Sequence, residues 1–323
     1  MKAEEYGSVL SKRVASVLAR TRPGSTVEPL RVLPGGHSGL TYRAETSDGA
    51  VVVKAVPPGR RPIGRHDMIR QARIMRALAP TPVPVPRIVA VDETEPAWFA
   101  MEFCEGESLE PVLDDPPLDP TVAAARMRRA AEILPSLHSV PVDTLPVAGP
   151  ALDPGDELAR WARTMDAVPP ELVEGADILH DALARRVPTG QAPTLVHGDY
   201  RLGNLISRGT EPVALIDWEI WSIGDPRVEL GWFLVFADGS NFPGVGRVVP
   251  ELPTAEELVE TYAGTGSAPQ ALDWFHALGR FKMAAIMGHN LRRHREGRHH
   301  DPDQERLPAT IARLISTGRD LVA

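Results

Sequence analysis

An aspartate and an asparagine five residues apart form the most informative pattern in the chain. Asp199 and Asn204 lie in one polar segment, and a second aspartate, Asp217, ends an apolar run 13 residues after Asn204. A strand, a turn and a second strand fit in that interval and would bring Asn204 and Asp217 side by side. Two adjacent oxygen ligands suit Mg²⁺, which takes few protein ligands and completes its shell with phosphate and water. Asp199 is then available as the base for a substrate hydroxyl.

Arg201, two residues after Asp199, is a candidate catalytic cation that would lie near a transferred phosphate. A solvated arginine is the alternative. His197 is interpreted as a structural residue beneath the loop rather than as a substrate contact. The segment could also be a capped turn without chemistry or half of a metallohydrolase site, but no further His and Asp ligands follow in the order that a hydrolase needs.

Lys54 is the second candidate. The sequence has four lysines, and Lys54 is the only one between Lys12 and Lys282. It interrupts the apolar run Val51–Val56. A lysine in an apolar strand is costly unless it is paired or binds an anion, so we interpret Lys54 as a phosphate ligand. An exposed lysine on an edge strand is the alternative.

A turn rich in glycine precedes this strand. Backbone N–H groups in such a turn can cradle a triphosphate, and we expect a nucleotide to contact Gly35, Gly36, His37 and Ser38.

The adenine would bind at an extended segment further along, where the backbone can present one donor and one acceptor to the purine edge. This hinge consists of Met101, Glu102, Phe103 and Cys104. Val53 and Ile216 are the expected apolar neighbours of the base.

The elements that must position these residues divide the chain in two. Short β-branched or alternating runs and one helical period fill the first part, and we expect strands at 28–34, 40–46, 50–56, 87–92 and 97–104 and a helix at 65–79. Beyond it we expect a β segment over 194–218 and helices at 119–138, 154–165, 170–186, 226–236, 254–263, 269–294 and 304–321. This predicts an α+β protein with a small β-sheet N-lobe (residues 1–104) and a larger, mainly helical C-lobe (residues 105–323).

The combined motifs resemble a known family. They are the run His197-Gly198-Asp199-Tyr200-Arg201 with Asn204, then Asp217-Trp218-Glu219, Gly224-Asp225-Pro226 and Leu230-Gly231-Trp232. The arrangement follows the logic of the protein-kinase catalytic loop. It is most similar to the aminoglycoside phosphotransferase-like small-molecule kinases, in the branch similar to the kinase-like domains found fused to acyl-CoA dehydrogenase-like domains.

This resemblance implies a bilobal protein-kinase-like fold, ATP and Mg²⁺ as cofactors, and transfer of the γ-phosphate to a hydroxyl of a small molecule. Asp199 would be the base, Asn204 and Asp217 the metal ligands, and Lys54 the ligand of the α- and β-phosphates. Asp225 would cap the helix that follows and steady the catalytic loop. The pattern leaves open whether the nucleotide is ATP or GTP.

The most important departure from the family concerns the partner of Lys54. The strand lysine usually pairs with a glutamate on the next helix, where this chain has Gln71. Gln71 can offer Lys54 only an amide oxygen. A nucleotide-binding pseudokinase or interaction module without turnover is therefore the alternative function. A protein kinase is disfavoured, because the seven residues from Asp217 to Gly224 leave no room for a long activation loop.

Composition excludes several other classes. The net charge is −8, whereas nucleic-acid binders are usually basic. The apolar run at 230–237 is far shorter than a membrane span. The single cysteine, Cys104, and the absence of an apolar stretch near the first residue lead us to expect a cytoplasmic protein. We expect a small-molecule hydroxyl substrate and neither a nucleic-acid nor a membrane partner; the acceptor and the oligomeric state stay open.

Overall fold

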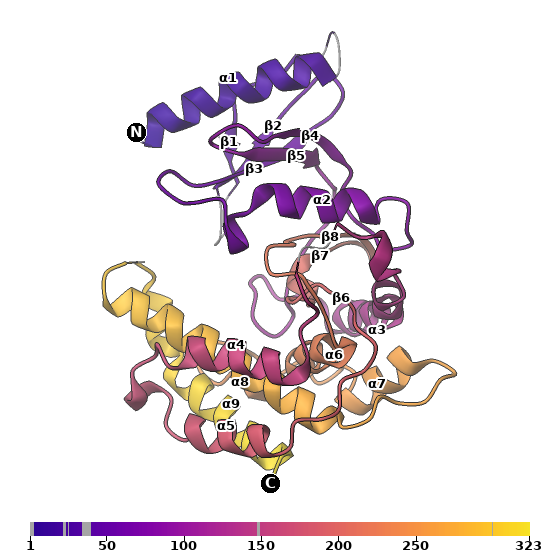
Figure 1. Cartoon of the computed structure of the whole chain (residues 1–323), viewed down its shortest axis with the longest axis vertical. Helices are drawn as coiled ribbons and strands as arrows, with labels where there is room; N and C mark the ends of the chain where they lie inside the picture. Colours follow the sequence, from indigo (N-terminus) through magenta and orange to yellow (C-terminus); the bar gives the residue numbers. More distant parts are fainter. Residues whose placement is uncertain (1–2, 22–23, 25, 34–39, 147–148, 299) are drawn as a thin grey trace. The chain divides into compact units, whose positions relative to one another are not determined.

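The computed structural model describes residues 3–21, 24, 26–33, 40–146, 149–298 and 300–323 (Figure 1). The chain divides into two compact units, which are described separately. The first unit comprises Met1–Gly106, Thr144–Pro146 and Val213–Ile220, and the second comprises Glu107–Asp143, Val147–Pro212 and Trp221–Ala323. The lobe boundary at residues 104 and 105 stays a prediction.

The first unit contains a five-stranded antiparallel sheet in the order β1-β2-β3-β5-β4. Its strands are β1 (Arg31–Val32), β2 (Leu40–Ala44), β3 (Val51–Ala55), β4 (Ile88–Asp92) and β5 (Trp98–Glu102). All five predicted strands are present, but the first is only two residues long. Gly49, in the turn between β2 and β3, has φ of 107°, a conformation that favours glycine.

Helix α1 (Ala3–Thr21) covers one face of this sheet and was not expected from the sequence. Its buried residues, Tyr6, Leu10, Val14 and Leu18, recur every four positions and so form one apolar stripe. They share a core with alternate residues of β3, including Val53. Because strand side chains alternate between faces, Lys54 belongs to the opposite face.

Helix α2 (Met68–Leu78) packs against β4 and β5. The carboxylate of Asp67 caps it by accepting a hydrogen bond from the backbone N–H of Arg70 (2.9 Å). The helix therefore starts three residues later than predicted. Residues Gly64–His66, which precede it, form a 3₁₀ turn instead. A proline follows at position 80 and cannot continue the helix.

The second unit is mainly helical. Its helices are α3 (Pro120–His138), α4 (Pro154–Met165), α5 (Ala176–Arg185), α6 (Pro226–Leu234), α7 (Ala255–Ala263), α8 (Leu272–Arg295) and α9 (Pro308–Leu321). The predicted helix at 170–186 is wrong in its first part, because Gly175 adopts φ of 80° and α5 begins only after it. The helix expected from 304 starts at Pro308, and a 3₁₀ turn precedes it.

Short strands interrupt these helices. Strands β6 (Thr194–Val196) and β9 (Ser222–Gly224) pair antiparallel, and β7 (Leu205–Arg208) pairs with β8 (Glu211–Leu215). The predicted β segment over 194–218 thus corresponds to β6, β7 and β8, while β9 was not expected. The loop between β6 and β7 carries the Asp199 motif.

Helix α8 is the centre of the second unit and packs against α4, α5, α6 and α9. Its contact with α6 is unusually close: a Cβ on Gly231 would lie 2.3 Å from the carbonyl oxygen of Phe275, and one on Gly279 would lie 2.7 Å from that of Gly231. Only glycines allow two helix backbones to approach in this way. The close packing brings side chains of α6 and α8 to the loop after β6.

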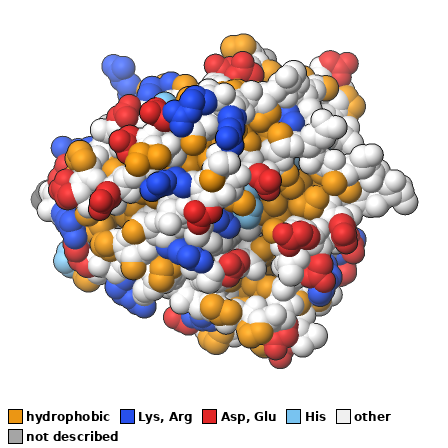
Figure 2. All heavy atoms as spheres, turned by 90° about the horizontal axis from the view of Figure 1, so that it is seen from below, with side chains coloured by type: hydrophobic (Ala, Val, Ile, Leu, Met, Phe, Trp, Pro, Cys, Tyr) orange, Lys and Arg blue, Asp and Glu red, His pale blue; other side chains and the backbone are white. Residues whose placement is uncertain are grey.

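On the face that Figure 2 shows, acidic and basic side chains are intermixed with apolar ones, as is usual for protein surfaces. No helix in the described part of the chain is both long and apolar enough to cross a membrane.

Candidate active site

The carboxylate of Asp199 is held by two side chains of the second unit. Its Oδ1 accepts a hydrogen bond from Nε1 of Trp232 (3.1 Å), and its Oδ2 accepts one from Nδ2 of Asn204 (2.8 Å). Asn204 also donates to the backbone carbonyl of Asp199 (2.8 Å). Asp199 and Asn204, which the sequence predicts in one loop, are therefore in direct contact, and the carboxylate has a defined orientation.

This contact also orients Asn204. Because its Nδ2 donates to Asp199, the amide oxygen is the atom that a cation would bind. Asn204 belongs to the second unit and Asp217 to the first, so their pairing around one metal stays a prediction. Within the described residues, no group of three or more His, Cys, Asp and Glu side chains could hold a metal ion. The two-ligand site expected for Mg²⁺ does not require such a group.

The backbone of the Asp199 loop is held by Glu229, which the sequence reading did not assign to the site. Glu229 lies on α6, is fully buried, and accepts hydrogen bonds from the N–H groups of His197, Gly198 (3.0 Å) and Tyr200 (3.3 Å). Burial raises the pKa of Glu229, and the positive charge of Lys282 opposes that rise. The sequence does carry a sign of this role, because Glu229 directly precedes the apolar run that starts at Leu230.

Asp225 has one of its two predicted roles. It caps α6 as expected, through the N–H of Arg227 (3.0 Å), but its other contacts are the guanidinium of Arg227 and the N–H of Gln191 (2.9 Å). The carboxylate that accepts hydrogen bonds from the loop backbone is that of Glu229 instead. His197 is fully buried beneath the loop, in agreement with a structural role.

Lys282 is a second residue that the sequence reading did not assign to the site. It lies on α8, is 3% exposed, and donates a hydrogen bond from Nζ to the carbonyl of Gly198. Its ammonium lies 3.8 Å from the ring centroid of Trp232 and 5.0 Å from that of Trp161. Burial lowers the pKa of Lys282, and the negative charges of Asp199, Glu157 and Glu229 partly offset this.

Arg201 lies between two acids. Its Nε is 3.5 Å from Oδ1 of Asp199, and its Nη1 is 3.8 Å from Oε2 of Glu110. Glu110 is fully buried and accepts a hydrogen bond from the N–H of Gly203 (3.2 Å). Burial raises the pKa of Glu110 to about 8, although Arg201 and Gly203 both act in the opposite direction. Arg201 is thus anchored beside the predicted base.

The buried Glu110 should make stability depend on pH. An unfolded glutamate ionises near its ordinary pKa of about 4.5, whereas the folded one ionises near 8, so the folded protein binds more protons between these values. Stability must then fall as pH rises from about 5 to 8. Glu110→Gln should remove this loss of stability. The melting temperature of the variant relative to that of the wild type should therefore rise from pH 5 to pH 8.

Thermal unfolding of both proteins at pH 5, 6.5 and 8 measures this effect. Glu174→Gln, at an exposed position, is the matched control and should follow the wild type at every pH. A melting difference between Glu110→Gln and the wild type that stays constant from pH 5 to 8 would contradict the expected ionisation.

In the first unit, Lys54 pairs with Asp217. The side chain of Lys54 is 10% exposed, and its Nζ lies 2.7 Å from Oδ1 of Asp217. Asp217 follows β8 and has φ of 67°, which is uncommon for a residue other than glycine. Such conformations concentrate at functional sites. Two predicted ligands, one for phosphate and one for metal, are therefore in contact.

The partner of Lys54 differs from the one expected. Gln71 is buried on α2, and its Nε2 donates to the carbonyl of Arg65 (3.0 Å). The carboxylate of Asp217 instead supplies the negative charge near Lys54. Removal of the Asp217 side chain should therefore also affect folding, because Lys54 would lose its ion-pair partner.

The hinge differs in detail from the expectation. Met101 and Glu102 end β5, and the N–H groups of Glu102 and Phe103 donate to the carbonyls of Arg87 (2.9 Å) and Ala50 (3.1 Å). These two donors are used within the unit, so they are not the purine donor in this arrangement. Cys104 lies two residues after the end of β5 and is partly buried.

The other predicted nucleotide contacts are Val53 and the glycine-rich turn. Val53 packs in the core with α1, on the opposite face of β3 from Lys54, so a base bound on the lysine face of the sheet would not contact Val53, contrary to the expectation. The turn residues Gly35, Gly36, His37 and Ser38 lie outside the described residues.

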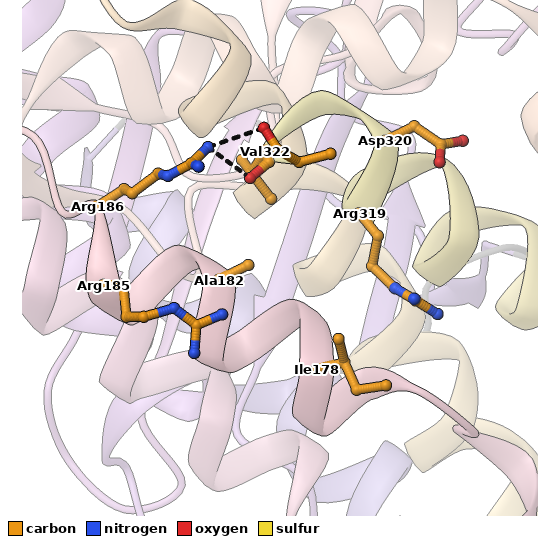
Figure 3. Close-up of a pocket in the computed structure, with 8 residues that line it drawn as sticks. Ile178, Ala182, Arg185, Arg186, Arg319, Asp320 and Val322 are labelled. Carbon is orange, nitrogen blue, oxygen red and sulfur yellow. Dashed lines mark hydrogen bonds between the residues drawn. The ribbon is translucent and has the colours of Figure 1, made fainter.

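A surface pocket elsewhere in the second unit lies between α5 and the C-terminal end of α9 (Figure 3). Arg186 lines it and donates hydrogen bonds to the carbonyls of Val322 (2.7 Å) and Ala323 (3.0 Å). None of the residues that line this pocket is among the predicted site residues.

Comparison with known proteins gives one family. The model of the phosphotransferase enzyme family APH matches residues 29–264. Acyl-CoA dehydrogenase family member 10 of Mus musculus is 29% identical over 272 residues, which are 78% of this chain and 25% of that protein. The chain thus spans about a quarter of the length of this relative.

Two solved structures share the fold. A protein of Ralstonia eutropha JMP134 assigned to the aminoglycoside phosphotransferases aligns with a TM-score of 0.78 and 23% identity, over 96% of this chain and 97% of that one. Choline kinase LicA from Streptococcus pneumoniae aligns with a TM-score of 0.62 and 18% identity, over 97% and 99%. LicA is also known in complex with AMP.

Proposed function

Since the chain belongs to the APH phosphotransferase enzyme family, we propose that it is an ATP- and Mg²⁺-dependent kinase that phosphorylates a hydroxyl of a small molecule. The observation that carries this proposal is the Asp199 carboxylate, which Trp232 and Asn204 hold in one orientation. Its side chain is 26% exposed, so a substrate hydroxyl can reach it. The net charge of −8 argues against nucleic acid as the acceptor.

The residues present fit a nucleotide with its metal ion. Lys54 is a nearly buried cation whose partner, Asp217, offers carboxylate oxygens, and Asn204 can present an amide oxygen. This hard-oxygen donor set suits Mg²⁺. Lys54 would bind the α- and β-phosphates, and Asn204 and Asp217 would hold the metal. The AMP complex of the structurally similar LicA supports a nucleotide site in this fold.

The proposed reaction is the transfer of a phosphoryl group to the acceptor hydroxyl. ATP with Mg²⁺ supplies the phosphoryl group. Asp199 orients the acceptor hydroxyl and accepts its proton as the acceptor oxygen bonds to the γ-phosphorus and the bond to the ADP oxygen breaks. Arg201, 3.5 Å from Asp199, adds positive charge beside the acceptor oxygen.

A nucleotide-binding pseudokinase or interaction module is the second candidate. One observation favours it: Gln71 replaces the glutamate that usually pairs with the strand lysine, and it bonds to Arg65 instead. The pair between Lys54 and Asp217 and the orientation of Asp199 by Asn204 favour turnover. Release of ADP that depends on a hydroxyl substrate separates the two.

Asp217→Asn tests the metal site directly. The amide oxygen keeps an acceptor for Lys54 but removes the negative charge, so the affinity for Mg²⁺–ATP should fall at least tenfold, by about 1.4 kcal/mol or more. Calorimetric titration with ATP in the presence of Mg²⁺ and then of EDTA measures it, and the loss should be confined to the Mg²⁺ titration.

Asp92→Asn is the matched control, because it removes the carboxylate of another ion pair of the same unit, with Arg13 (2.6 Å). It should leave the affinity for Mg²⁺–ATP within about twofold. Wild-type affinity in Asp217→Asn would remove Asp217 from the metal site.

A further inference from the structure

Packing alone does not explain why a lysine is buried at position 282. It lies in the middle of α8, is 3% exposed, and faces the loop that carries Asp199. A buried ammonium needs compensating partners, and an apolar side chain of similar length would fill the same volume without that cost. Two of its contacts lead to the predicted base.

The first route runs through the backbone. The ammonium of Lys282 donates to the carbonyl of Gly198, and the N–H of the same peptide, that of Asp199, donates to Nδ1 of His197 (3.2 Å). Both polar groups of the peptide bond between Gly198 and Asp199 therefore have a hydrogen-bond partner. The rotation of this peptide sets the direction in which the Asp199 side chain leaves the loop.

The second route runs through Trp232. Its ring centroid lies 3.8 Å from the Lys282 ammonium, while its Nε1–H donates to Oδ1 of Asp199 (3.1 Å). A cation over an indole face is attracted to the π electrons, so Lys282 holds the ring that orients the carboxylate. Trp161 on α4 contributes a second aromatic face, 5.0 Å from the ammonium.

The charged groups around Lys282 belong to the Asp199 loop, α4 and α6. Asp199 of the loop, Glu157 of α4 and Glu229 of α6 are negative, and Arg160 of α4 is positive. Glu157 is itself fixed by the Nε1–H of the neighbouring Trp161 (2.9 Å). The acids outnumber the arginine and favour the charged form of Lys282, against the burial that opposes it.

We propose that Lys282 is a positioning residue of the active site: through the Gly198 carbonyl and the Trp232 ring, its ammonium sets the orientation of the Asp199 carboxylate. This rests on the phosphotransfer proposed above. Lys282 is too buried to touch the substrate, so it acts on the acceptor hydroxyl only through Asp199. Its loss should lower kcat and leave the KM for ATP unchanged.

Two substitutions test this. Lys282→Met keeps most of the volume without the charge, and Lys282→Ala opens a space between Trp161 and Trp232. Because misplacement of a catalytic group by about 1 Å can cost 10²-fold, both should lose at least about tenfold in kcat, with the KM for ATP within twofold. Arg280→Met, which removes a cation from the same helix, should keep wild-type turnover.

Rescue by a small amine separates positioning from packing. Propylammonium, added at tens of millimolar, should restore a substantial part of kcat in Lys282→Ala, whereas the neutral n-propanol should not. A folded variant with kcat within threefold of the wild type would overturn the proposal. So would a loss that propylammonium and n-propanol relieve equally or not at all. If Lys282→Ala does not fold, kcat of Lys282→Met decides.

A readout without turnover keeps this inference distinct from the proposed function. In wild-type protein the backbone amide resonance of Asp199 reports on the held peptide. It should shift in Lys282→Ala and return toward the wild-type position with propylammonium. An inactive wild type would end the proposed function alone, whereas an Asp199 resonance that ignores both the substitution and the amine would end the positioning role.

Discussion

Asp199→Asn should lower turnover on any accepted hydroxyl substrate by about 10²- to 10⁴-fold, the usual contribution of a general base. The amide cannot accept the hydroxyl proton. It is also poorly matched to its surroundings, because both carboxylate oxygens accept hydrogen bonds, from Trp232 and Asn204, and an amide presents only one acceptor oxygen. The affinity for Mg²⁺–ATP should stay within a few-fold, since Lys54 and Asp217 are unchanged.

Steady-state ADP release and calorimetric ATP titration measure the two halves of this expectation. Asp166→Asn, at the exposed end of α4, is the control for a generic loss of one carboxylate and should retain wild-type turnover. If Asp199→Asn turned over within about threefold of the wild type, the hydroxyl would have to be activated by another group.

Glu229→Ala should destabilise the protein by about 3–5 kcal/mol, the cost of breaking a buried charged network by removing one partner. The N–H groups of His197, Gly198 and Tyr200 would lose their acceptor, and Lys282 would lose one of its compensating charges. Urea unfolding followed by circular dichroism measures the loss.

Two more conservative variants should lose less stability than Glu229→Ala. Glu229→Gln keeps an acceptor oxygen and should lose less than the alanine variant, and Glu229→Asp should also lose less, because it keeps the charge on a shorter side chain. A Glu229→Ala protein within about 1 kcal/mol of the wild type would mean that other groups hold the loop.

Many of the strands and helices could be predicted from local sequence patterns. Strands β2 to β5 follow from alternating or β-branched runs bounded by turn residues, and α3 and α4 begin where an Asp-Pro pair caps and opens each helix. Helix α1 is not among the predicted elements, although its buried residues Tyr6, Leu10, Val14 and Leu18 recur every four positions, a period that is visible in the sequence.

The contacts of the site were harder to derive. The short spacing of Asp199 and Asn204 within one loop predicted their neighbourhood correctly. The partner of Lys54 could not be read in the same way, because Asp217 is 163 residues away and reaches it only through the tertiary fold. The same holds for Lys282, which bonds to a carbonyl 84 residues away from it along the chain.

The central claim is that this chain transfers phosphate from ATP to a small-molecule hydroxyl with Asp199 as the base. The most direct measurement is coupled ADP release by the wild-type protein with Mg²⁺–ATP against a panel of hydroxyl-bearing metabolites and antibiotics, with Asp199→Asn in parallel. The account predicts at least one compound that raises ADP release in the wild type and leaves the variant at background. A wild type that binds Mg²⁺–ATP but shows the same ADP release as Asp199→Asn on every compound would contradict it.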